Sequence, residues 1–370
     1  MRLRHLAIVG FRNLGTIRIE PGACFNLLYG LNGQGKTNLL EAIYLLGSPR
    51  SFRSSRLPEL IRHGGQIAQI QGEIESGGIR SHIRLSLEAA GRKVEIDGKG
   101  IQRASDLHGR LNAVVFSPDD TGMVRMGPEA RRRYLDRAVY MGDIDYLHCW
   151  HSFQRILKQR NQLLKNSDRS GLDTWTEKLA ETGAEVIERR QRFVTLLSGM
   201  MQKHYATISG CRETADISYR PDGVQASDRT GIYGQLLELF NRHAKNDERY
   251  GTTTAGPHRD DLTLCLDGRQ LKSFGSQGQQ KSFVLALKMA EMDNLQSIFA
   301  EPPLLLLDDM SSELDGCRNQ NLMDFLTSRD IQVFITTTER SPALLGVAAN
   351  CAVFRVEDGN LTFEGNISHE

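Results

Sequence analysis

The sequence lacks several features that would point to other classes of protein. None of its apolar runs approaches the roughly 18 residues that a membrane-spanning helix needs. The first residues, "MRLRHLAIVGFRN", contain no apolar core of the kind found in signal peptides. The six cysteines include no C-x-x-C pair, which argues against a zinc site and against a disulfide framework. These absences predict a soluble cytoplasmic protein without a membrane partner.

Charge of either sign is also not in excess. The chain has 46 basic and 45 acidic residues and a net charge of +1, which neither indicates nor excludes nucleic acid, because the two signs can be segregated on the surface. The 39% apolar and 25% charged residues are typical of a globular protein. A chain of 370 residues is long enough for two domains.

A phosphate-binding loop is the strongest motif that is present. The apolar run "CFNLLYGL" predicts a buried strand, and "GLNGQGKTN" then matches G-x-x-x-x-G-K-[ST] before a predicted helix. The glycines allow backbone N–H groups to face phosphates, Lys36 reaches the β and γ oxygens, and Thr37 binds Mg²⁺. The alternative is a chance glycine turn before a helix, but the strand and the helix that the motif requires are predicted on both sides of it. The nucleotide-binding candidates are Gly30, Leu31, Asn32, Gly33, Gln34, Gly35, Lys36, Thr37 and Asn38.

Two adjacent acids follow a second buried strand. In "PPLLLLDDMSSELD" the leucines 304–307 predict a central parallel strand, and Asp308 and Asp309 lie at its carboxyl end, where open α/β sheets bind ligands. We expect Asp308 to hold Mg²⁺ and Asp309 to act as the base for an attacking water. The alternative is a solvated strand end. The strand "IQVFITTTER" ends in three threonines at the same edge of the sheet.

A second anion-binding loop precedes these acids by about 30 residues. "SFGSQGQQKS" (273–282) crowds serine, glycine and glutamine at the start of a helix with a long apolar face. The positive end of a helix attracts anions. The alternative is an ordinary helix that Ser273 or Ser276 caps. The candidate residues of this signature loop are Ser276, Gln277, Gly278 and Gln279.

The order of these motifs resembles the SMC-like branch of the ABC-type ATPases. In such proteins the second loop reaches across to a γ-phosphate held by a partner, so that two heads enclose two ATP molecules, and Ser276 is then the hydroxyl donor. Six further matches narrow the resemblance to the RecF family. They are "FRNL" (11–14), "VVFSPDD" (114–120), "ARRRYLD" (130–136), "KQRNQLL" (158–164), "GPHRDDL" (256–262) and "FGSQGQQKS" (274–282).

This resemblance implies a fold, an activity and partners. The fold is an α/β ABC/SMC-type ATPase head, with a mixed β-sheet and a parallel P-loop core, plus a helical lobe with a short antiparallel hairpin. The activity is a weak DNA-stimulated ATPase of recombinational DNA repair and replication-fork maintenance, with ATP and Mg²⁺ as cofactors. The partners are double-stranded and gapped DNA, a second copy of the chain when ATP is bound, and RecO and RecR, with which RecF-family mediators load recombinase at single-strand gaps.

Further candidate residues come from position within this pattern. Arg12 and Asn13 are candidates for contact with the nucleotide, and Ser312, Glu313 and Asp315 for a loop at the dimer interface. Two departures from the wider ABC pattern matter. The sequence "SPDD" replaces the usual glutamine, so Asp119 or Asp120 is expected to sense the nucleotide. Threonines replace the usual histidine, with Thr337 taken as the catalytic one, and this predicts turnover below the roughly 10 per second median for enzymes.

The middle of the chain predicts helices. We expect one helix from about residue 128 to Lys165, a turn at "NSDRSG", and a second helix with apolar residues at three-to-four spacing. Such a hairpin of about 30 residues per arm spans roughly 45 Å, far shorter than an SMC coiled coil. The predicted domains are a discontinuous head, 1–127 and 245–370, and a helical lobe, 128–244.

Basic residues cluster at two places and make candidates for DNA contact. The candidates are Arg53, Arg56, Arg131, Arg132 and Arg133. Each cluster could equally be a solvated face. No aromatic ladder interleaves them, which favours contact with the backbone of duplex DNA over stacking on single strands. Two other functions remain as alternatives: the ATPase subunit of an ABC transporter, or another SMC-like repair ATPase. A metabolic kinase would leave the second anion loop without a role.

Overall fold

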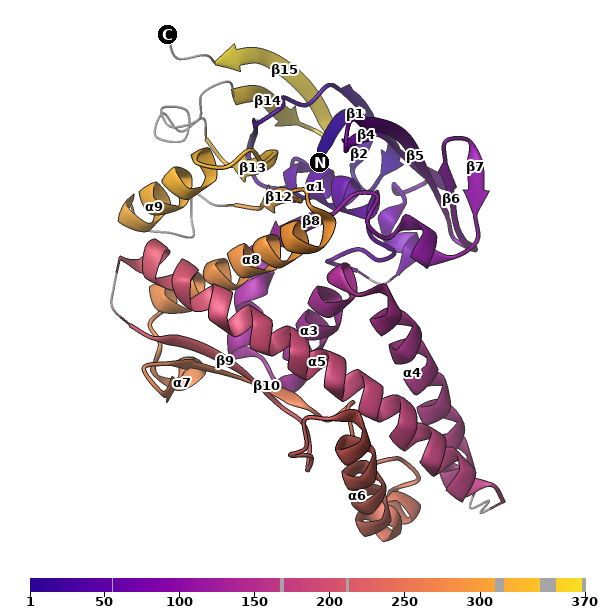
Figure 1. Ribbon diagram of the computed structural model, residues 1–370. Helices are drawn as coiled ribbons and strands as arrows, with labels where there is room; N and C mark the ends of the chain where they lie inside the picture. The colour runs from indigo at the N-terminus through magenta and orange to yellow at the C-terminus, as the bar shows by residue number, and fades with distance from the viewer. Residues whose placement is uncertain (55, 167–169, 211–212, 310–315, 340–350, 368–370) are drawn as a thin grey trace. The chain divides into compact units, whose positions relative to one another are not determined.

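A computed structural model describes residues 1–54, 56–166, 170–210, 213–309, 316–339 and 351–367 (Figure 1). The chain forms two compact units. The first comprises Met1–Asp120, Thr207–Cys211 and Gln277–Glu370, and the second comprises Thr121–Ala206 and Arg212–Ser276. The second unit is therefore an insertion into the first.

The division lies elsewhere than the predicted boundaries at residues 127 and 245. Residues 245–276 belong to the second unit, because strand β10 (Asp261–Leu266) pairs with β9 (Ala215–Arg220). This pairing and the short β11 (Arg269–Gln270) make a three-stranded antiparallel sheet, which holds the chain in the second unit until just before the signature helix.

An antiparallel sheet of six strands begins the first unit. Its order is β2 (Leu14–Ile19), β1 (Arg2–Phe11), β4 (Ile67–Ser76), β5 (Ile79–Glu88), β6 (Gly91–Ile96) and β7 (Lys99–Ile101). Buried and exposed residues alternate along β4 and β5, as in a sheet with one face on the core and one in solvent.

The second sheet of this unit carries the nucleotide motifs. Its order is β15 (Asn360–Ile367), β14 (Cys351–Glu357), β3 (Phe25–Tyr29), β13 (Val333–Thr337), β12 (Leu304–Leu307) and β8 (Ala113–Phe116). All its strands from β14 to β8 run parallel, and β15 pairs antiparallel with β14. Strands β8, β12 and β13 are buried at every position, which confirms the strands predicted from the leucine run and from "IQVFITTT".

In the part of the first unit that the structure describes, this sheet is accompanied by helices α1 (Lys36–Leu45), α8 (Gln277–Phe299) and α9 (Gly316–Thr327). Helix α8 is buried on all sides over residues 282–292, rather than along one face as the sequence predicted. Short 3₁₀ turns lie between α1 and β4 (Leu57–Leu60), between β7 and β8 (Ala104–Leu107), and after β8 (Pro118–Thr121). The core fills the space between the two sheets and α1, with Leu3, Ile8, Leu39, Ile43 and Leu306 fully buried.

The second unit is mainly helical. Its helices are α2 (Gly122–Arg125), α3 (Pro128–Gly142), α4 (Ile144–Lys165), α5 (Leu172–Ser209, of which residues 207–209 belong to the first unit), α6 (Arg229–Tyr250) and α7 (Leu271–Phe274). The predicted single helix to Lys165 is broken at Asp143, whose side chain caps α4 by accepting from the Tyr146 N–H at 3.2 Å.

Helices α4 and α5 form the predicted antiparallel hairpin (Figure 1). Arg160 of α4 contacts Thr176 near the turn, and Tyr146 contacts Arg190 farther along, so residue numbers rise on one helix as they fall on the other. With 38 residues, α5 is roughly 57 Å long.

A buried arginine joins two of the sequence motifs within the second unit. Arg190, fully buried, donates to Asp136 of "ARRRYLD" at 2.6 Å and to the Pro257 carbonyl of "GPHRDDL" at 2.8 Å. It also lies 3.3 Å from Asp260 and stacks on Trp150. Removing one partner of such a buried pair costs about 3–5 kcal/mol, so these motifs hold the helices of this unit together.

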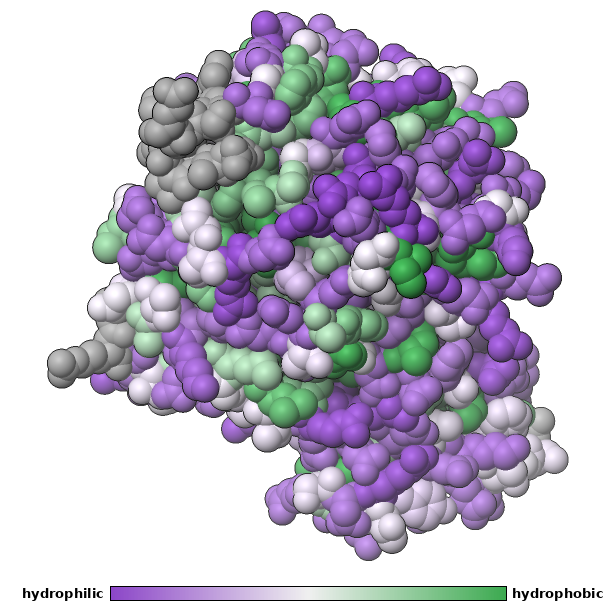
Figure 2. Space-filling model, turned by 45° about the horizontal axis from the view of Figure 1, so that its top comes forward, coloured by the Kyte–Doolittle hydropathy of each residue, from purple (hydrophilic) through white to green (hydrophobic). Residues whose placement is uncertain are grey.

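No helix among the described residues is long and apolar enough to cross a membrane. Hydrophilic residues make up most of the face seen in Figure 2, with hydrophobic ones scattered among them.

Candidate nucleotide-binding site

The P-loop lies where the sequence predicts it, between β3 and the first turn of α1. Gly30, Gly33 and Gly35 have φ angles of 154°, 81° and 113°, values that residues with a side chain rarely adopt. At Gly30 the constraint is also one of space, since a Cβ would lie 2.2 Å from the Val356 carbonyl oxygen of β14. The loop is thus shaped by a strand from the other end of the sequence.

The P-loop lysine is folded against its own loop. Lys36 Nζ donates to the carbonyls of Gly30 at 2.5 Å and Leu31 at 2.9 Å, and the residue is 8% exposed. Burial lowers the pKa of Lys36, and the carboxylates of Asp309 and Asp308 oppose that effect. The lysine charge therefore lies within electrostatic range of both predicted acids.

Thr37 and Asp308 meet as the motif pair requires. Thr37 Oγ1 donates to Asp308 Oδ1 at 2.9 Å, although the two residues are far apart in sequence. Strand β13 lies between β3 and β12, and its Thr336 donates to the same oxygen at 2.7 Å. Burial raises the pKa of Asp308, and the hydrogen bonds from Thr336 and Thr37 counter the rise.

Asp309 occupies an unusual backbone conformation beside this pair. Its φ of 51° lies in the left-handed region, which residues other than glycine seldom adopt. Its N–H donates to Thr336 Oγ1 at 2.9 Å. Such local strain is found at functional sites.

Thr336, and not Thr337, contacts the acids. The Thr337 hydroxyl donates to the Glu339 carbonyl at 3.1 Å, and its own carbonyl accepts from the Gly30 N–H at 3.3 Å. The side chain predicted to be catalytic therefore points to the backbone after β13. The hydroxyl that donates to Asp308 together with that of Thr37 is the hydroxyl of Thr336, the preceding residue.

The donor set fits Mg²⁺ held jointly with phosphates. Among the described residues no group of three or more His, Cys, Asp or Glu side chains forms a metal cage. One hydroxyl and one carboxylate, 2.9 Å apart, are what this ion takes from a protein when nucleotide oxygens and water complete its shell.

The signature loop includes the position in the chain where the second unit ends, at Ser276, and the first resumes, at Gln277. Ser276 is exposed and directly precedes α8, as the sequence predicts for a helix N-terminus. Gly278 lies in the first turn of α8, and Arg318 of α9 packs against it. The contact is so close that a Cβ at Gly278 would lie 2.2 Å from Arg318 Nη1. A guanidinium thus adds positive charge beside the helix terminus, a feature that sequence reasoning missed. Phe274, just before the loop, is 70% exposed.

Comparison with known proteins places this geometry in a family. The model of the RecF/RecN/SMC N-terminal domain matches residues 2–362. The DNA replication and repair protein RecF of Trichlorobacter lovleyi is 48% identical over 99% of each chain, and that of Geotalea uraniireducens 46% identical over 98% of this chain and all of the relative. The chain belongs to the RecF family.

Solved structures agree with this RecF assignment. The structure of the recombination mediator protein RecF with ATP, from the RecFOR pathway, is 32% identical, with a TM-score of 0.88 over 98% of this chain and 99% of that one. An Smc head domain of Pyrococcus furiosus shares the fold, with a TM-score of 0.57 at 16% identity over 99% of this chain and 96% of that one. The predicted fold class, an ABC/SMC-type ATPase head with a helical lobe, is confirmed.

The arginines predicted to bind DNA differ in their availability in this RecF-family chain. Arg56 and Arg133 are 81% and 70% exposed, and Arg53 is 37% exposed. Arg131 instead forms a bidentate pair with Asp261 at 2.6 and 2.8 Å, and Arg132 donates to the Asp260 carbonyl at 2.8 Å. The guanidiniums of Arg131 and Arg132 therefore serve contacts within the second unit.

The two predicted sensing residues also differ. Asp119 is exposed, whereas Asp120 accepts from the N–H and hydroxyl of Ser117 at 2.8 and 3.0 Å. Asp120 also lies 3.4 Å from Lys288, a lysine of α8 that is 1% exposed and 3.3 Å from Glu291. Sequence reasoning missed this link, which ties the loop after β8 to the signature helix. Ser312, Glu313 and Asp315 lie outside the described residues.

Glu41 is a second residue that sequence reasoning missed. It is fully buried on α1, with Arg12 and Arg53 beside its carboxylate. A glutamate inside the apolar run "LLEAIYLL" was the signal that could have identified it.

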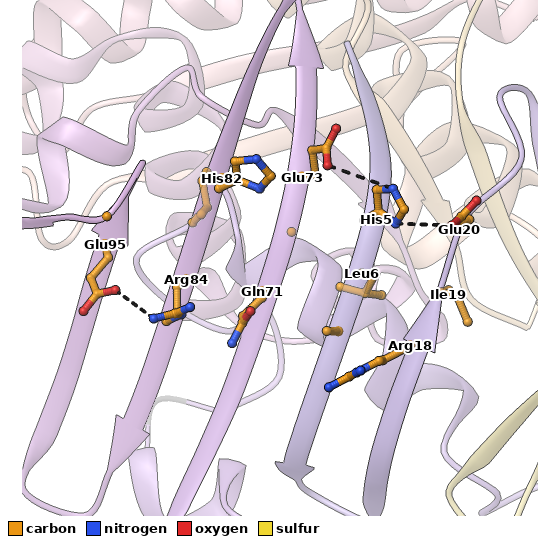
Figure 3. A pocket seen from close by; sticks show the side chains of 14 residues that line it. His5, Leu6, Arg18, Ile19, Glu20, Gln71, Glu73, His82, Arg84 and Glu95 are labelled. Carbon is orange, nitrogen blue, oxygen red and sulfur yellow. Dashed lines mark hydrogen bonds and ion pairs between the residues drawn. The ribbon is translucent and has the colours of Figure 1, made fainter.

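A hollow of about 520 Å³ on the solvent face of the antiparallel sheet is not part of this site (Figure 3). Its charged residues come from neighbouring strands and face one another: His5 lies 3.7 Å from Glu20 and 4.0 Å from Glu73, and Arg84 lies 3.4 Å from Glu95. Cross-strand pairs of this kind stabilise a sheet and need no ligand.

Proposed function

We propose that this chain is an ATP-dependent DNA-binding ATPase of recombinational repair, which dimerises face to face when ATP is bound. The observation that carries the proposal is the meeting of Thr37, Asp308 and Thr336 at the mouth of a complete P-loop. Lys36 and the loop N–H groups would bind the phosphates, and Asp309 would orient and deprotonate water. Mg²⁺ held by Thr37 and Asp308 would supply charge stabilisation to the phosphates.

The face-to-face dimer accounts for the second anion loop. Ser276 is exposed at the start of α8, and Arg318 adds a cation to the same loop. Leu31 of the P-loop and Phe274 beside the signature loop are 74% and 70% exposed, so both loops present apolar surface that a partner copy would cover. ATP would complete this interface from one copy's P-loop to the other's Ser276.

DNA would then be bound through its backbone by Arg53, Arg56 and Arg133, with Asp119 or Asp120 relaying the state of the nucleotide. Affinity should therefore fall steeply with salt. As in the RecFOR pathway for which its relatives are described, the chain would act in the cytoplasm with RecO and RecR to load recombinase at single-strand gaps. Hydrolysis would be slow, below the roughly 10 per second enzyme median, and would drive release.

The decisive experiment measures the mass of the protein in solution with and without ATP and Mg²⁺. The native chain should be monomeric without nucleotide and dimeric with it. Ser276→Arg should bind ATP and remain monomeric, because its side chain would clash with the partner's triphosphate. Ser170→Arg, at another exposed serine, beside the turn of the hairpin, should dimerise normally.

Two further variants separate binding from hydrolysis. Lys36→Ala should lose ATP binding, and Asp309→Asn should bind and dimerise but not turn over. A normal ATP-dependent dimer of Ser276→Arg would remove the role given to the signature loop. Steady-state turnover of the native protein well above 10 per second would contradict the slow mechanism.

A further inference from the structure

The buried carboxylate of Glu41 has no role in the function proposed above. Glu41 is 0% exposed on a helix whose other buried residues are mostly apolar. A charge in such a place is costly unless it is paired, so the fold must retain it for the partners it binds.

Those partners are two arginines and a serine from distant segments. Arg12, at the turn between β1 and β2, makes a bidentate fork to the carboxylate, at 2.6 Å from Nε and 2.7 Å from Nη2. Ser51 donates to Oε1, and Arg53 Nη1 lies 3.6 Å from Oε2. One negative charge thus faces two positive ones.

Each arginine is linked to a residue that contacts the loop. Arg53 donates to Asn38 Oδ1 at 2.7 Å, and Asn38 donates to Asn13 Oδ1 at 2.7 Å. Asn13, the neighbour of Arg12 in the chain, donates to the Gly33 carbonyl at 3.0 Å.

Asn13 also fits closely against the second half of the P-loop. A Cβ on Gly35 would lie 2.8 Å from Asn13 Oδ1. Asn13, together with Leu14 Cδ2 at 2.7 Å, therefore limits the space beside Gly35.

We infer that Glu41 is a positioning residue for the nucleotide: it fixes Arg12 and Arg53, and through them Asn13 and Asn38, in the arrangement that shapes the P-loop at Gly33. Removing its charge removes the fork on Arg12, which keeps its Nη1 bond to the Glu59 carbonyl at 3.1 Å, and removes the countercharge beside Arg53. With Arg12 held less firmly, the Asn13 turn moves relative to the loop, so the N–H groups lose their alignment on the phosphates. This inference rests on the proposed binding of ATP at the P-loop.

The test is a double-mutant cycle on the full-length chain, read by titration of a fluorescent ATP analogue. Glu41→Gln and Arg12→Gln should each raise the Kd at least about tenfold. Because both act through one fork, the double variant should be no weaker than the poorer single variant.

A matched control lies at the other end of the same strand. Arg4 makes a similar fork to Glu75, at 3.1 and 3.0 Å, about 26 Å along β1 from Arg12. Glu75→Gln should leave the Kd within about twofold. Thermal melting without nucleotide separates positioning from folding, since a purely structural residue would lower the Tm and leave the Kd of the folded protein unchanged.

Three outcomes would overturn the inference. One is a Kd of folded Glu41→Gln within about twofold of the native value, and another is a double variant whose loss is the product of the two single losses. If Glu41→Gln does not fold, Arg12→Lys is tested in its place, because lysine keeps the charge and loses the fork. The third outcome that would overturn the inference is then a Kd of Arg12→Lys equal to the native value. Binding that survives Lys36→Ala would instead mark a failure of the proposed P-loop function.

Discussion

Replacing Thr336 by valine tests the organisation of the acidic pair directly. Valine has the shape of threonine without its hydroxyl, which donates to Asp308 at 2.7 Å and accepts from the Asp309 N–H at 2.9 Å. The variant therefore loses two hydrogen bonds at one fully buried position.

The expected loss of stability follows from these two bonds. A hydrogen bond to a charged group contributes about 1.5–3 kcal/mol, and an orphaned buried N–H costs about 1–3 kcal/mol. Valine regains part of this through apolar burial, so we expect a net loss of about 2–4 kcal/mol in the free energy of unfolding. At roughly 2–4 °C per kcal/mol for a unit of this size, the Tm should fall by about 5–15 °C.

The functional effect should appear in the pH profile of hydrolysis. The Thr336 hydrogen bond is the main contribution that counters the burial-induced rise in the pKa of Asp308. Without it the pKa rises further, and the carboxylate that we propose as the Mg²⁺ ligand is lost at a higher pH. The acid limb of kcat/KM should therefore move to higher pH, with the Mg²⁺ requirement raised about 10–100-fold.

Thr337→Val is the matched control, since that hydroxyl, equally buried, donates to the Glu339 carbonyl. It should lose stability and keep the acid limb of the native enzyme. The reasoning fails if both variants give the native pH profile, or if Thr337→Val alone moves it.

Three other predictions concern charge and accessibility. Lys288→Met should lower the free energy of unfolding by about 3–5 kcal/mol in denaturant titrations, because it removes the buried cation that lies 3.4 Å from Asp120 and 3.3 Å from Glu291, two largely buried carboxylates. Arg133→Ala should weaken DNA binding and reduce its salt dependence by about one charge, whereas Arg131→Ala should mainly lower the Tm; the reverse result would contradict the ion pairs described. Alkylation of the native protein at pH 8 should modify exposed Cys317 and spare Cys149, whose pKa burial raises to about 12; equal labelling of both would refute this.

The parts of the fold that the sequence predicted well depend on local patterns. The P-loop, the leucine strand and the start of α8 are each predicted by a pattern within about ten residues, because hydrophobic periodicity and glycine spacing are properties of short segments. The hairpin was predicted for the same reason. The end of α3 at Gly142 and the start of a new helix after Asp143 were not predicted, although aspartate is a usual N-cap residue.

The errors concern contacts between residues far apart in sequence. Three adjacent arginines were treated as one basic face, yet successive residues on a helix point about 100° apart, so 131 and 132 turn inward and 133 outward. Likewise, which of two neighbouring threonines reaches Asp308 depends on the register between β12 and β13, and only the three-dimensional structure supplies it.

The strand order has a consequence for synthesis of the protein. The P-loop leaves the ribosome early, but the strand beside it, β13, and the Val356 carbonyl that packs against Gly30 are made some 300 residues later. At about 5–20 residues per second, these neighbouring segments are synthesised tens of seconds after the loop. We therefore expect an unfinished chain to bind nucleotide poorly, because its P-loop lacks the neighbouring strand and the carbonyl that pack against it.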